Sequence, residues 1–288
     1  MLIYLPIVHM GGTGTVLHGV GATYRQCPYM ATVGAKWYYD WGISPTLCGG
    51  VEAVPMIHRV ADVGKAVGGN STWILWFNEP ELTGQNNYIS PEQAAQLWNA
   101  NIGAYPGKKH VSPAVTDLSW LSRFLVLVLQ KPNALAVHYY AWRDLAAEIA
   151  RTTEFLRQAV DLAQRYGIGE VWLTEWAGLH GWMGQDAALE YERRMLTEVL
   201  PSFPQITHEA WFQLSYRGDE EWAFGVDCNT SLIDYNTGQL TPFGQVYKDN
   251  IGTTSNWDER ADVNKNGEVN IFDITIVGSH FGERKGVS

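Results

Sequence analysis

Two glutamates stand in apolar runs of the kind that form buried strands. Glu79 follows the run WILWFN at 73–78, and Glu175 lies in the run WLTEWA at 172–177. Hydrolysis of a glycosidic bond needs two carboxyl groups beside the sugar, because one protonates the leaving oxygen while the other attacks or activates water. A lone glutamate would more simply pair with an arginine or cap a helix. Here the neighbouring tryptophans impose a desolvation cost that stability does not require, so we interpret the two carboxylates as a catalytic pair.

The elements that must position this pair are short strands separated by helices. Apolar runs rich in Val, Ile, Trp and Tyr predict eight strands, at 16–24, 35–41, 54–57, 73–78, 110–115, 135–140, 171–175 and 210–215. Helices are predicted at 91–102 with Ser90 as N-cap, at 118–130, at 146–166 and at 185–200. The connections after the first three strands are too short or too rich in glycine for long helices.

Strands that read as continuous apolar runs and alternate with helices are typical of a parallel sheet covered by helices. Eight such units predict an α/β fold, a closed (β/α)8 TIM barrel over residues 15–252 with some short or missing outer helices. A doubly wound open sheet is the alternative, but its phosphate-binding GxGxxG turn is missing. In a barrel of this type the strand ends at the carboxyl side form the active site, and strands four and seven place Glu79 and Glu175 opposite each other.

At these residues the sequence resembles glycoside hydrolase family 128, a group of retaining endo-acting β-1,3-glucanases. The matching stretches are KWYYDW at 36–41, VPMI at 54–57, FNEPE at 77–81, SPA at 112–114, VHYY at 137–140, WLTEWA at 172–177 and AWF at 210–212. The resemblance implies that Glu79 is the general acid/base and Glu175 the nucleophile. It also implies that Asn78 binds the sugar hydroxyl next to the reacting carbon. Asp40 departs from the pattern, where we expect Asn.

A retaining mechanism needs no cofactor. It requires the two carboxyl groups to lie about 5–5.5 Å apart and the acid to have a raised pKa. Two alternatives keep the chemistry and change the substrate. The protein would then be a related hydrolase of the same clan that acts on β-1,4-mannan or on β-1,4-glucan. A further alternative is a carbohydrate-binding protein without turnover.

Aromatic residues are abundant, with 13 Trp, 14 Tyr and 9 Phe, and flat rings stack on the apolar faces of sugars. Candidates for substrate binding lie on one face of the second strand, on one face of the sixth strand, and in the segments near strand ends. They are Trp37, Tyr39 and Trp41, then His138 and Tyr140, then Trp142, Trp176, Trp182 and Trp211. The alternative for Trp37 is packing inside the barrel, and for His138 it is a core histidine bonded to the backbone.

Charge and cysteine content limit the partners and the compartment. The 20 basic and 30 acidic residues give a formal charge of −10, which disfavours nucleic acid and anionic membranes but suits a neutral glycan. No apolar run is long enough to cross a membrane. Cys27 and Cys48 either form a disulfide or are buried as small apolar residues. We expect a monomer in an extracellular location, although Met1–Val8 shows no recognisable signal peptide.

The C-terminal segment has a different pattern. Residues 253–261 read as a linker, and 262–284 fit one calcium loop followed by a helix, with Gly267 at the sharp turn. The predicted ligands are Asp262, Asn264, Asn266, the carbonyl of Glu268, Asn270 and Asp273. The segment resembles one repeat of a dockerin, which carries two, and this implies a cohesin partner. The alternative is a solvated polar tail.

Overall fold

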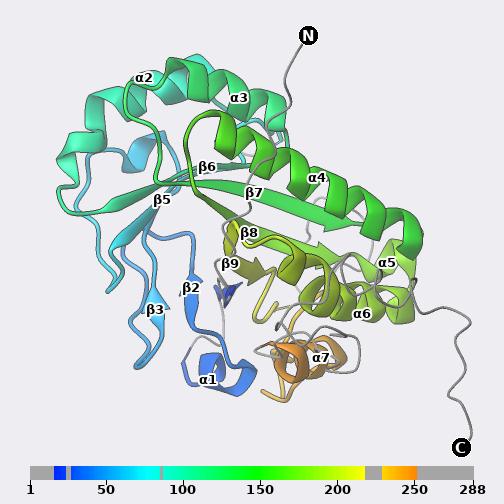
Figure 1. Cartoon of the computed structure of the whole chain (residues 1–288). Coiled ribbons are helices and arrows are strands. Elements are labelled where there is room, and N and C mark those ends of the chain that lie inside the picture. The colour runs from blue at the N-terminus through cyan, green and yellow to red at the C-terminus, as the bar shows by residue number, and fades with distance from the viewer. Residues whose placement is uncertain (1–15, 24–26, 85–86, 218–228, 252–288) are drawn as a thin grey trace, which may run out of the picture. The chain divides into compact units, whose positions relative to one another are not determined.

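The computed structural model describes residues 16–23, 27–84, 87–217 and 229–251 (Figure 1). The predicted linker at 253–261 and the calcium loop and helix at 262–284 lie outside the described residues. The dockerin-like repeat, its calcium and its cohesin partner therefore stay predictions from the sequence.

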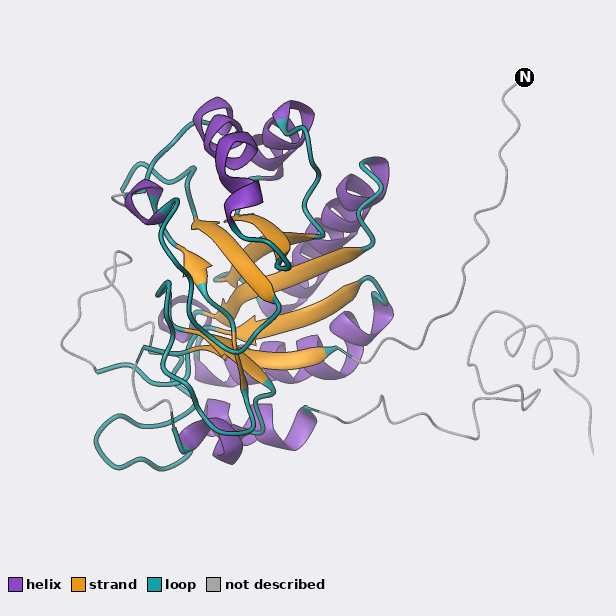
Figure 2. Cartoon of the chain, turned by 90° about the vertical axis from the view of Figure 1, so that its left-hand side faces the viewer, coloured by secondary structure: helices purple, strands orange, loops and turns teal. Residues whose placement is uncertain are grey.

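One parallel sheet forms the centre of the described chain. Its strands are β1 (Leu17–Gly21), β2 (Trp37–Tyr39), β3 (Glu52–Ala53), β4 (Met56–Ile57), β5 (Trp73–Asn78), β6 (Lys109–Val115), β7 (Ala134–Ala141), β8 (Glu170–Gly178) and β9 (Ile206–Trp211). Their spatial order is β3-β2-β1-β9-β8-β7-β6-β5-β4. Figure 2 shows this sheet curled, with helices packed around it.

The sheet closes through its third strand position. β3 and β4 stand at the two ends of the strand order, yet Val54 and Pro55 alone separate them in sequence. The Val54 N–H donates to the Tyr38 carbonyl on one side, and the Leu75 N–H donates to the Pro55 carbonyl on the other, both at 2.9 Å. Proline has no N–H, so it interrupts the predicted strand 54–57. The nine strands therefore fill eight positions, and the predicted (β/α)8 barrel is confirmed.

The helices of the first half are short or missing, and the long ones are α2 (Pro91–Asn101), α3 (Leu118–Leu127), α4 (Leu145–Arg165), α6 (Gln185–Arg194) and α7 (Pro242–Asn250). The four predicted helices are present as α2, α3, α4 and α6, whereas α7 was not predicted. Turns at η3 (Met195–Val199) and η4 (Leu200–Ser202) extend α6. Ser90 caps α2 as predicted, because its Oγ accepts from the Gln93 N–H at 3.2 Å and Gln93 Oε1 accepts from the Ser90 N–H at 3.0 Å.

In the first half, β1 is followed by the five-residue helix α1 (Tyr29–Val33), and β4 by the 3₁₀ turn η1 (Val60–Asp62). The fully described stretch 40–51 between β2 and β3 contains no helix. Cys27 and Cys48 form a disulfide with Cα atoms 5.4 Å apart, which joins the segment before α1 to the loop after β2. No helix in the described ranges has both the length and the apolar character needed to span a membrane.

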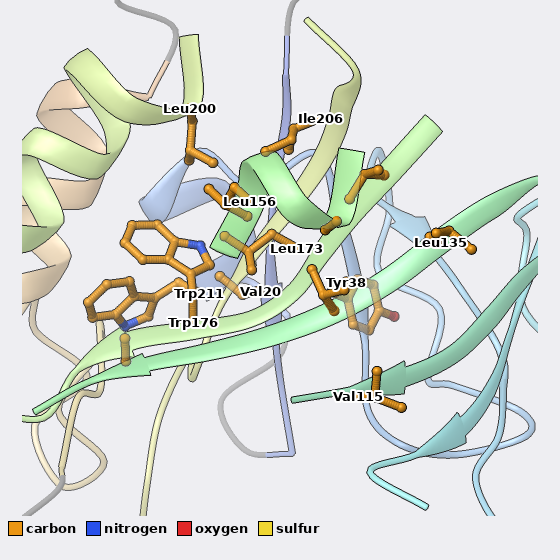
Figure 3. Close-up of a cluster of buried hydrophobic side chains, with 14 of the residues drawn as sticks. Val20, Tyr38, Val115, Leu135, Leu156, Leu173, Trp176, Leu200, Ile206 and Trp211 are labelled. Atoms are coloured by element: carbon orange, nitrogen blue, oxygen red, sulfur yellow. The ribbon is translucent and has the colours of Figure 1, made fainter. Parts of the chain in front are cut away.

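Two groups of buried side chains hold the barrel together. One lies between the strands and the helices, where Leu156, Leu173, Trp176 and Trp211 pack against one another (Figure 3). The other lies inside the barrel and combines large rings with alanines. Three of its rings, Trp37, Trp73 and Trp172, come from the first halves of their strands. Trp172 stacks on His208 with ring centroids 3.6 Å apart. This packing fills the amino-terminal end of the barrel, so the carboxyl ends of the strands are left to form a site.

Candidate active site

Glu79 stands directly after β5 on an unusual stretch of backbone. Phe77 and Glu79 have φ angles of 38° and 43°, in the left-handed region that side chains other than glycine rarely adopt. The register between β5 and β6 also shifts between Trp76 and Asn78. The Glu79 N–H donates to the Ala114 carbonyl of β6 at 2.9 Å, which ties the turn to the next strand. Such irregular backbone is stable where the surroundings determine it, and it is concentrated at functional sites.

Glu175 lies inside β8, which continues to Gly178 rather than ending at Glu175 as predicted. Three donors from other strands and loops surround its carboxylate. The Tyr140 hydroxyl lies 2.6 Å from Oε2, and Trp41 Nε1 lies 3.0 Å from Oε1. The Tyr39 hydroxyl lies 3.1 Å from Oε1 and 2.6 Å from the Thr174 carbonyl. Hydrogen bonds of this kind orient a carboxylate and favour its charged form.

His138 joins the two glutamates. Its Nδ1 lies 2.9 Å from Glu79 Oε1 and 3.4 Å from Glu175 Oε2. Each of Glu79, His138 and Glu175 has one atom that could bind a metal ion, and these three atoms lie within 4.8 Å of one another. Glycosidases that retain configuration have carboxyl groups about 5–5.5 Å apart, whereas inverting enzymes need roughly 6.5–9.5 Å for the intervening water. One oxygen of Glu79 lies within 4.8 Å of one oxygen of Glu175, as the shorter separation of the retaining class requires.

Burial controls the electrostatics of this cluster, since the side chains of Glu79 and Glu175 are 8% and 4% exposed. Burial raises the pKa of Glu175 and the charge of Glu79 adds to the rise, while His138 and the hydrogen bonds oppose it. For His138, burial lowers the pKa, but the negative charges of Glu175 and Glu79 outweigh it and the net shift is upward. Burial, reinforced by Glu175, raises the pKa of Tyr39 and Tyr140 well above 10, so both remain proton donors.

Asn78 is buried beside Glu79. Its Oδ1 has no hydrogen-bond partner among the described residues, and neither does Nε2 of His138. Buried polar atoms in native proteins are nearly always paired, so two unpaired ones next to the carboxylates call for an explanation. Hydroxyl groups of a bound sugar would satisfy both atoms.

Three of the predicted aromatic residues lie where a ligand can reach them. Trp142 follows the last residue of β7, and Trp182 lies in α5 (His180–Met183), which follows β8. Each is 43% exposed, and their rings meet edge to face with centroids 5.8 Å apart. Trp41 is half-buried and packs edge-on against Tyr39. Gly21 makes room for it, since a Cβ at this position would lie 2.8 Å from the Trp41 ring.

Three other predicted sugar-binding tryptophans are core residues. Trp37 lies fully buried inside the barrel, with its Nε1 bonded to the Leu17 carbonyl at 3.0 Å. Trp176 and Trp211 are fully buried on the outer side of the sheet, where their rings meet at 4.7 Å (Figure 3). Neighbours along a strand point to opposite faces, so Trp176 faces outward because Glu175 faces inward. These three assignments are corrected, because none of the rings is available to a sugar.

Asp40 has a structural role in the loop after β2. Its Oδ1 accepts from the Gly42 N–H at 3.0 Å, and its Oδ2 accepts from the Thr46 N–H at 3.3 Å. The carboxylate thereby fixes the start of the segment that runs from Trp41 towards Cys48. The aspartate accepts at both oxygens, whereas the expected asparagine has one acceptor oxygen and in this orientation could accept from only one of these two N–H groups.

Two residues near the site were not assigned from sequence. The Phe212 ring meets Trp41 at 5.9 Å and Tyr140 at 5.6 Å, so it supports two donors to Glu175. Glu81 accepts from the Thr116 N–H at 2.5 Å, its Oε2 is buried without a partner in the described structure, and burial raises its pKa. The motif FNEPE contains Glu81, but its spacing from Glu79 does not reveal the contact with Thr116, which directly follows β6.

Comparison with known proteins places the chain among glycoside hydrolases. The family model described as glycosyl hydrolase catalytic core matches residues 20–247. No curated protein matches the chain. Among solved structures, a curdlan-specific exo-β-1,3-glucanase of glycoside hydrolase family 128 from Blastomyces gilchristii has a TM-score of 0.65 at 24% identity, covering 82% of this chain and 99% of that one.

An endo-β-1,3-glucanase of the same family from Amycolatopsis mediterranei, solved with laminaripentaose, has a TM-score of 0.62 at 25% identity, covering 83% of this chain and 100% of that one. An oligosaccharide-binding protein of the family from Trichoderma gamsii has a TM-score of 0.62 at 16% identity, covering 84% and 96%. The predicted resemblance to glycoside hydrolase family 128 is confirmed. With its match over most of the barrel, the chain belongs to the glycosyl hydrolase catalytic core family.

Proposed function

We propose that this protein hydrolyses β-1,3-glucan internally by a retaining double displacement, with Glu79 as general acid/base and Glu175 as nucleophile. The observation that carries the proposal is the pair of buried carboxylates, with donor atoms within 4.8 Å and His138 between them. Such a pair at the carboxyl ends of barrel strands is the arrangement that retaining hydrolysis requires.

In the first step, a Glu175 oxygen attacks the anomeric carbon while the Glu79 proton passes to the leaving oxygen. The glycosidic bond breaks and a glycosyl ester forms on Glu175. In the second step, Glu79 takes a proton from water, which attacks the same carbon and releases Glu175. Loss of the Glu175 charge in the ester makes Glu79 more acidic than in the first step, because a neighbouring negative charge disfavours ionisation.

The remaining residues of the site orient these two. Tyr140 and Trp41 hold the Glu175 carboxylate by hydrogen bonds to different oxygens, and His138 holds Glu79 through Oε1. Asn78 Oδ1 is an unpaired buried acceptor next to Glu79, suited to a sugar hydroxyl. Trp142 and Trp182 offer exposed rings beside the site for further sugar units.

The substrate class rests on the structural relatives, since one is curdlan-specific and another was solved with laminaripentaose. An extracellular location is part of the proposal, supported by the Cys27–Cys48 disulfide and by a polymeric substrate. We also propose that the protein acts as a monomer. A second candidate function is oligosaccharide binding without turnover, because the Trichoderma gamsii protein has this description and the same fold.

The test is product analysis with soluble β-1,3-glucan, β-1,4-glucan and β-1,4-mannan, for the native protein, Glu175→Gln and Glu190→Gln. Glu190 is a surface residue paired with Arg193 and serves as the matched control. The proposal expects a series of oligosaccharides from β-1,3-glucan alone, absent for Glu175→Gln and kept for Glu190→Gln. Products from another glycan would overturn the substrate. Binding without any product would favour the second candidate.

A further inference from the structure

The catalytic cluster has the composition of a three-ligand transition-metal site. Glu79, His138 and Glu175 supply two carboxylate oxygens and one imidazole nitrogen. Imidazole and carboxylate together suit Zn²⁺, and three protein ligands with one open position is a common arrangement for this ion. Calcium would instead need six to eight oxygen ligands, which this cluster does not offer.

The spacing of the donor atoms also fits. Zinc binds nitrogen and oxygen ligands at about 2.0–2.2 Å, so neighbouring ligands of a tetrahedral ion lie about 3.3–3.5 Å apart. His138 Nδ1 lies 2.9 Å from Glu79 Oε1 and 3.4 Å from Glu175 Oε2. No two donor atoms of the cluster are more than 4.8 Å apart. Small side-chain rotations would bring the three atoms to three corners of a tetrahedron around one ion.

The surroundings favour a cation. All three side chains are nearly buried, with exposed fractions of 0% for His138, 8% for Glu79 and 4% for Glu175. Among the described residues, no lysine or arginine forms an ion pair with Glu175, whose partners are His138 and three neutral donors. Two carboxylates and a neutral imidazole compensate the charge of one divalent ion, so the bound ion leaves no net charge in this buried place.

The site lacks one feature of a permanent metal centre. Histidine ligands usually donate their second ring nitrogen to a carboxylate or carbonyl, and loss of that partner costs roughly 10- to 100-fold in affinity. His138 Nε2 has no partner in the described structure. An ion held here is therefore exchangeable.

We propose that the free active site binds one Zn²⁺ through Glu79, His138 and Glu175, and that the ion competes with substrate. The ion would lie between the two carboxylates, where the scissile bond must lie for hydrolysis. The competitive part of this inference rests on the proposed function, whereas binding of the ion does not.

The experiment is calorimetric titration of the full-length protein with ZnCl2, with and without a saturating, non-hydrolysable sulfur-linked β-1,3-gluco-oligosaccharide. We expect one binding event with a stoichiometry near one that disappears with the oligosaccharide. Its affinity should fall at least about tenfold in Glu79→Gln and in Glu175→Gln and stay unchanged in Glu190→Gln. When Co²⁺ replaces Zn²⁺, the native protein should show the visible absorption spectrum of four-coordinate Co²⁺. Both site variants should lack this spectrum.

An identical zinc isotherm in all variants would overturn the inference, as would a binding event that the oligosaccharide leaves unchanged while it demonstrably binds. The native protein with the oligosaccharide gives a result even if a variant fails to fold. A protein that hydrolyses no glycan but loses zinc binding in both site variants would retain the metal site and reject the proposed function. The two failures are therefore distinguishable.

Discussion

The Tyr140 hydroxyl lies 2.6 Å from Oε2 of Glu175, which makes this tyrosine, two residues beyond His138 on the same strand, a donor to the proposed nucleophile. Burial keeps the pKa of Tyr140 well above 10, so the hydroxyl stays protonated at working pH. The contact ties β7 to β8 at the point where chemistry is proposed, and it stabilises the charged form of the carboxylate.

Tyr140→Phe therefore tests positioning of the nucleophile. A hydrogen bond to a charged group contributes about 1.5–3 kcal/mol, so kcat/KM should fall about 10- to 150-fold. Loss of a donor to the anion also raises the pKa of Glu175, so the acidic limb of the pH profile of kcat/KM should move to higher pH. A loss of rate with an unmoved acidic limb would mean that Tyr140 has a packing role.

The exposed pair Trp142 and Trp182 should contribute to binding of long substrates. Stacking of an aromatic ring contributes about 0.5–1.5 kcal/mol beyond buried area, so Trp142→Ala and Trp182→Ala should each raise KM for the polysaccharide about 2- to 12-fold. Because the two rings pack edge to face with centroids 5.8 Å apart, the binding free energy lost in the double variant should be less than the sum of the losses in the two single variants. Unchanged KM values in both single variants would place the substrate elsewhere on the mouth.

A buried carboxyl group away from the candidate site should affect stability. Glu192 of α6 is fully buried without a hydrogen-bond partner in the described structure, and burial, with the charge of Glu209, raises its pKa well above 4.5. Glu209 in turn accepts hydrogen bonds from Tyr247 at 2.7 Å and from Trp176 at 2.5 Å, and it lies 2.9 Å from His18 Nδ1. Burial and the neighbouring Glu209 therefore favour the neutral form of Glu192.

Folding raises the pKa of the Glu192 carboxyl group above its value in the unfolded chain. Its contribution to stability is fully present at pH values below the pKa of the unfolded chain. This contribution is lost as the pH rises, because the unfolded chain ionises first. The melting temperature of the native protein should therefore fall between pH 5 and pH 8 relative to Glu192→Gln, with the variant higher by about 2–4 °C at the upper end. If the melting temperatures of the native protein and of Glu192→Gln change with pH in the same way over this range, Glu192 is ionised in the folded protein.

The Cys27–Cys48 disulfide should stabilise the loops around the mouth. It joins residues 21 apart in sequence, and closing a loop of this size contributes about 2–4 kcal/mol. Cys48→Ser should lower the free energy of unfolding by that amount in a denaturant titration. Addition of a reductant should bring the native protein to the same value. Equal stability of both proteins under oxidising conditions would contradict this.

Much of the fold could be predicted because its strands are apolar runs, although not all of their ends could be: β9 covers Ile206–Trp211 where 210–215 was predicted. The predicted strand at 73–78 coincides with β5, and the prediction of Ser90 as the N-cap of α2 is confirmed. The split of the third strand was missed because the effect of Pro55 depends on which neighbours it pairs with. The ring closes through β2 on one side and β5 on the other, and this is a long-range property.

The proximity of Glu79 and Glu175 could be predicted from residue type and strand position, whereas their surroundings could not. Trp176 seemed a sugar ligand because it adjoins Glu175, but strand alternation turns it to the outer face, opposite Trp211. Trp41 donates to Glu175 across a separation of 134 residues, and the sequence carries no signal for such a contact. Predictions from local spacing therefore located the two neighbouring glutamates, and the three-dimensional packing was needed to place the aromatic residues.

The most direct test of the central claim is to trap the glycosyl ester on Glu175. The native protein is incubated with a 2-deoxy-2-fluoro β-glucoside or laminaribioside that carries a good leaving group, and its intact mass and peptides are measured. The account predicts one added glycosyl unit, located on Glu175 and absent in Glu175→Gln. In Glu79→Gln the unit should still attach, since a good leaving group needs little protonation. A label on Glu79 would contradict the assigned roles, and inverted configuration of the natural product would contradict the double displacement.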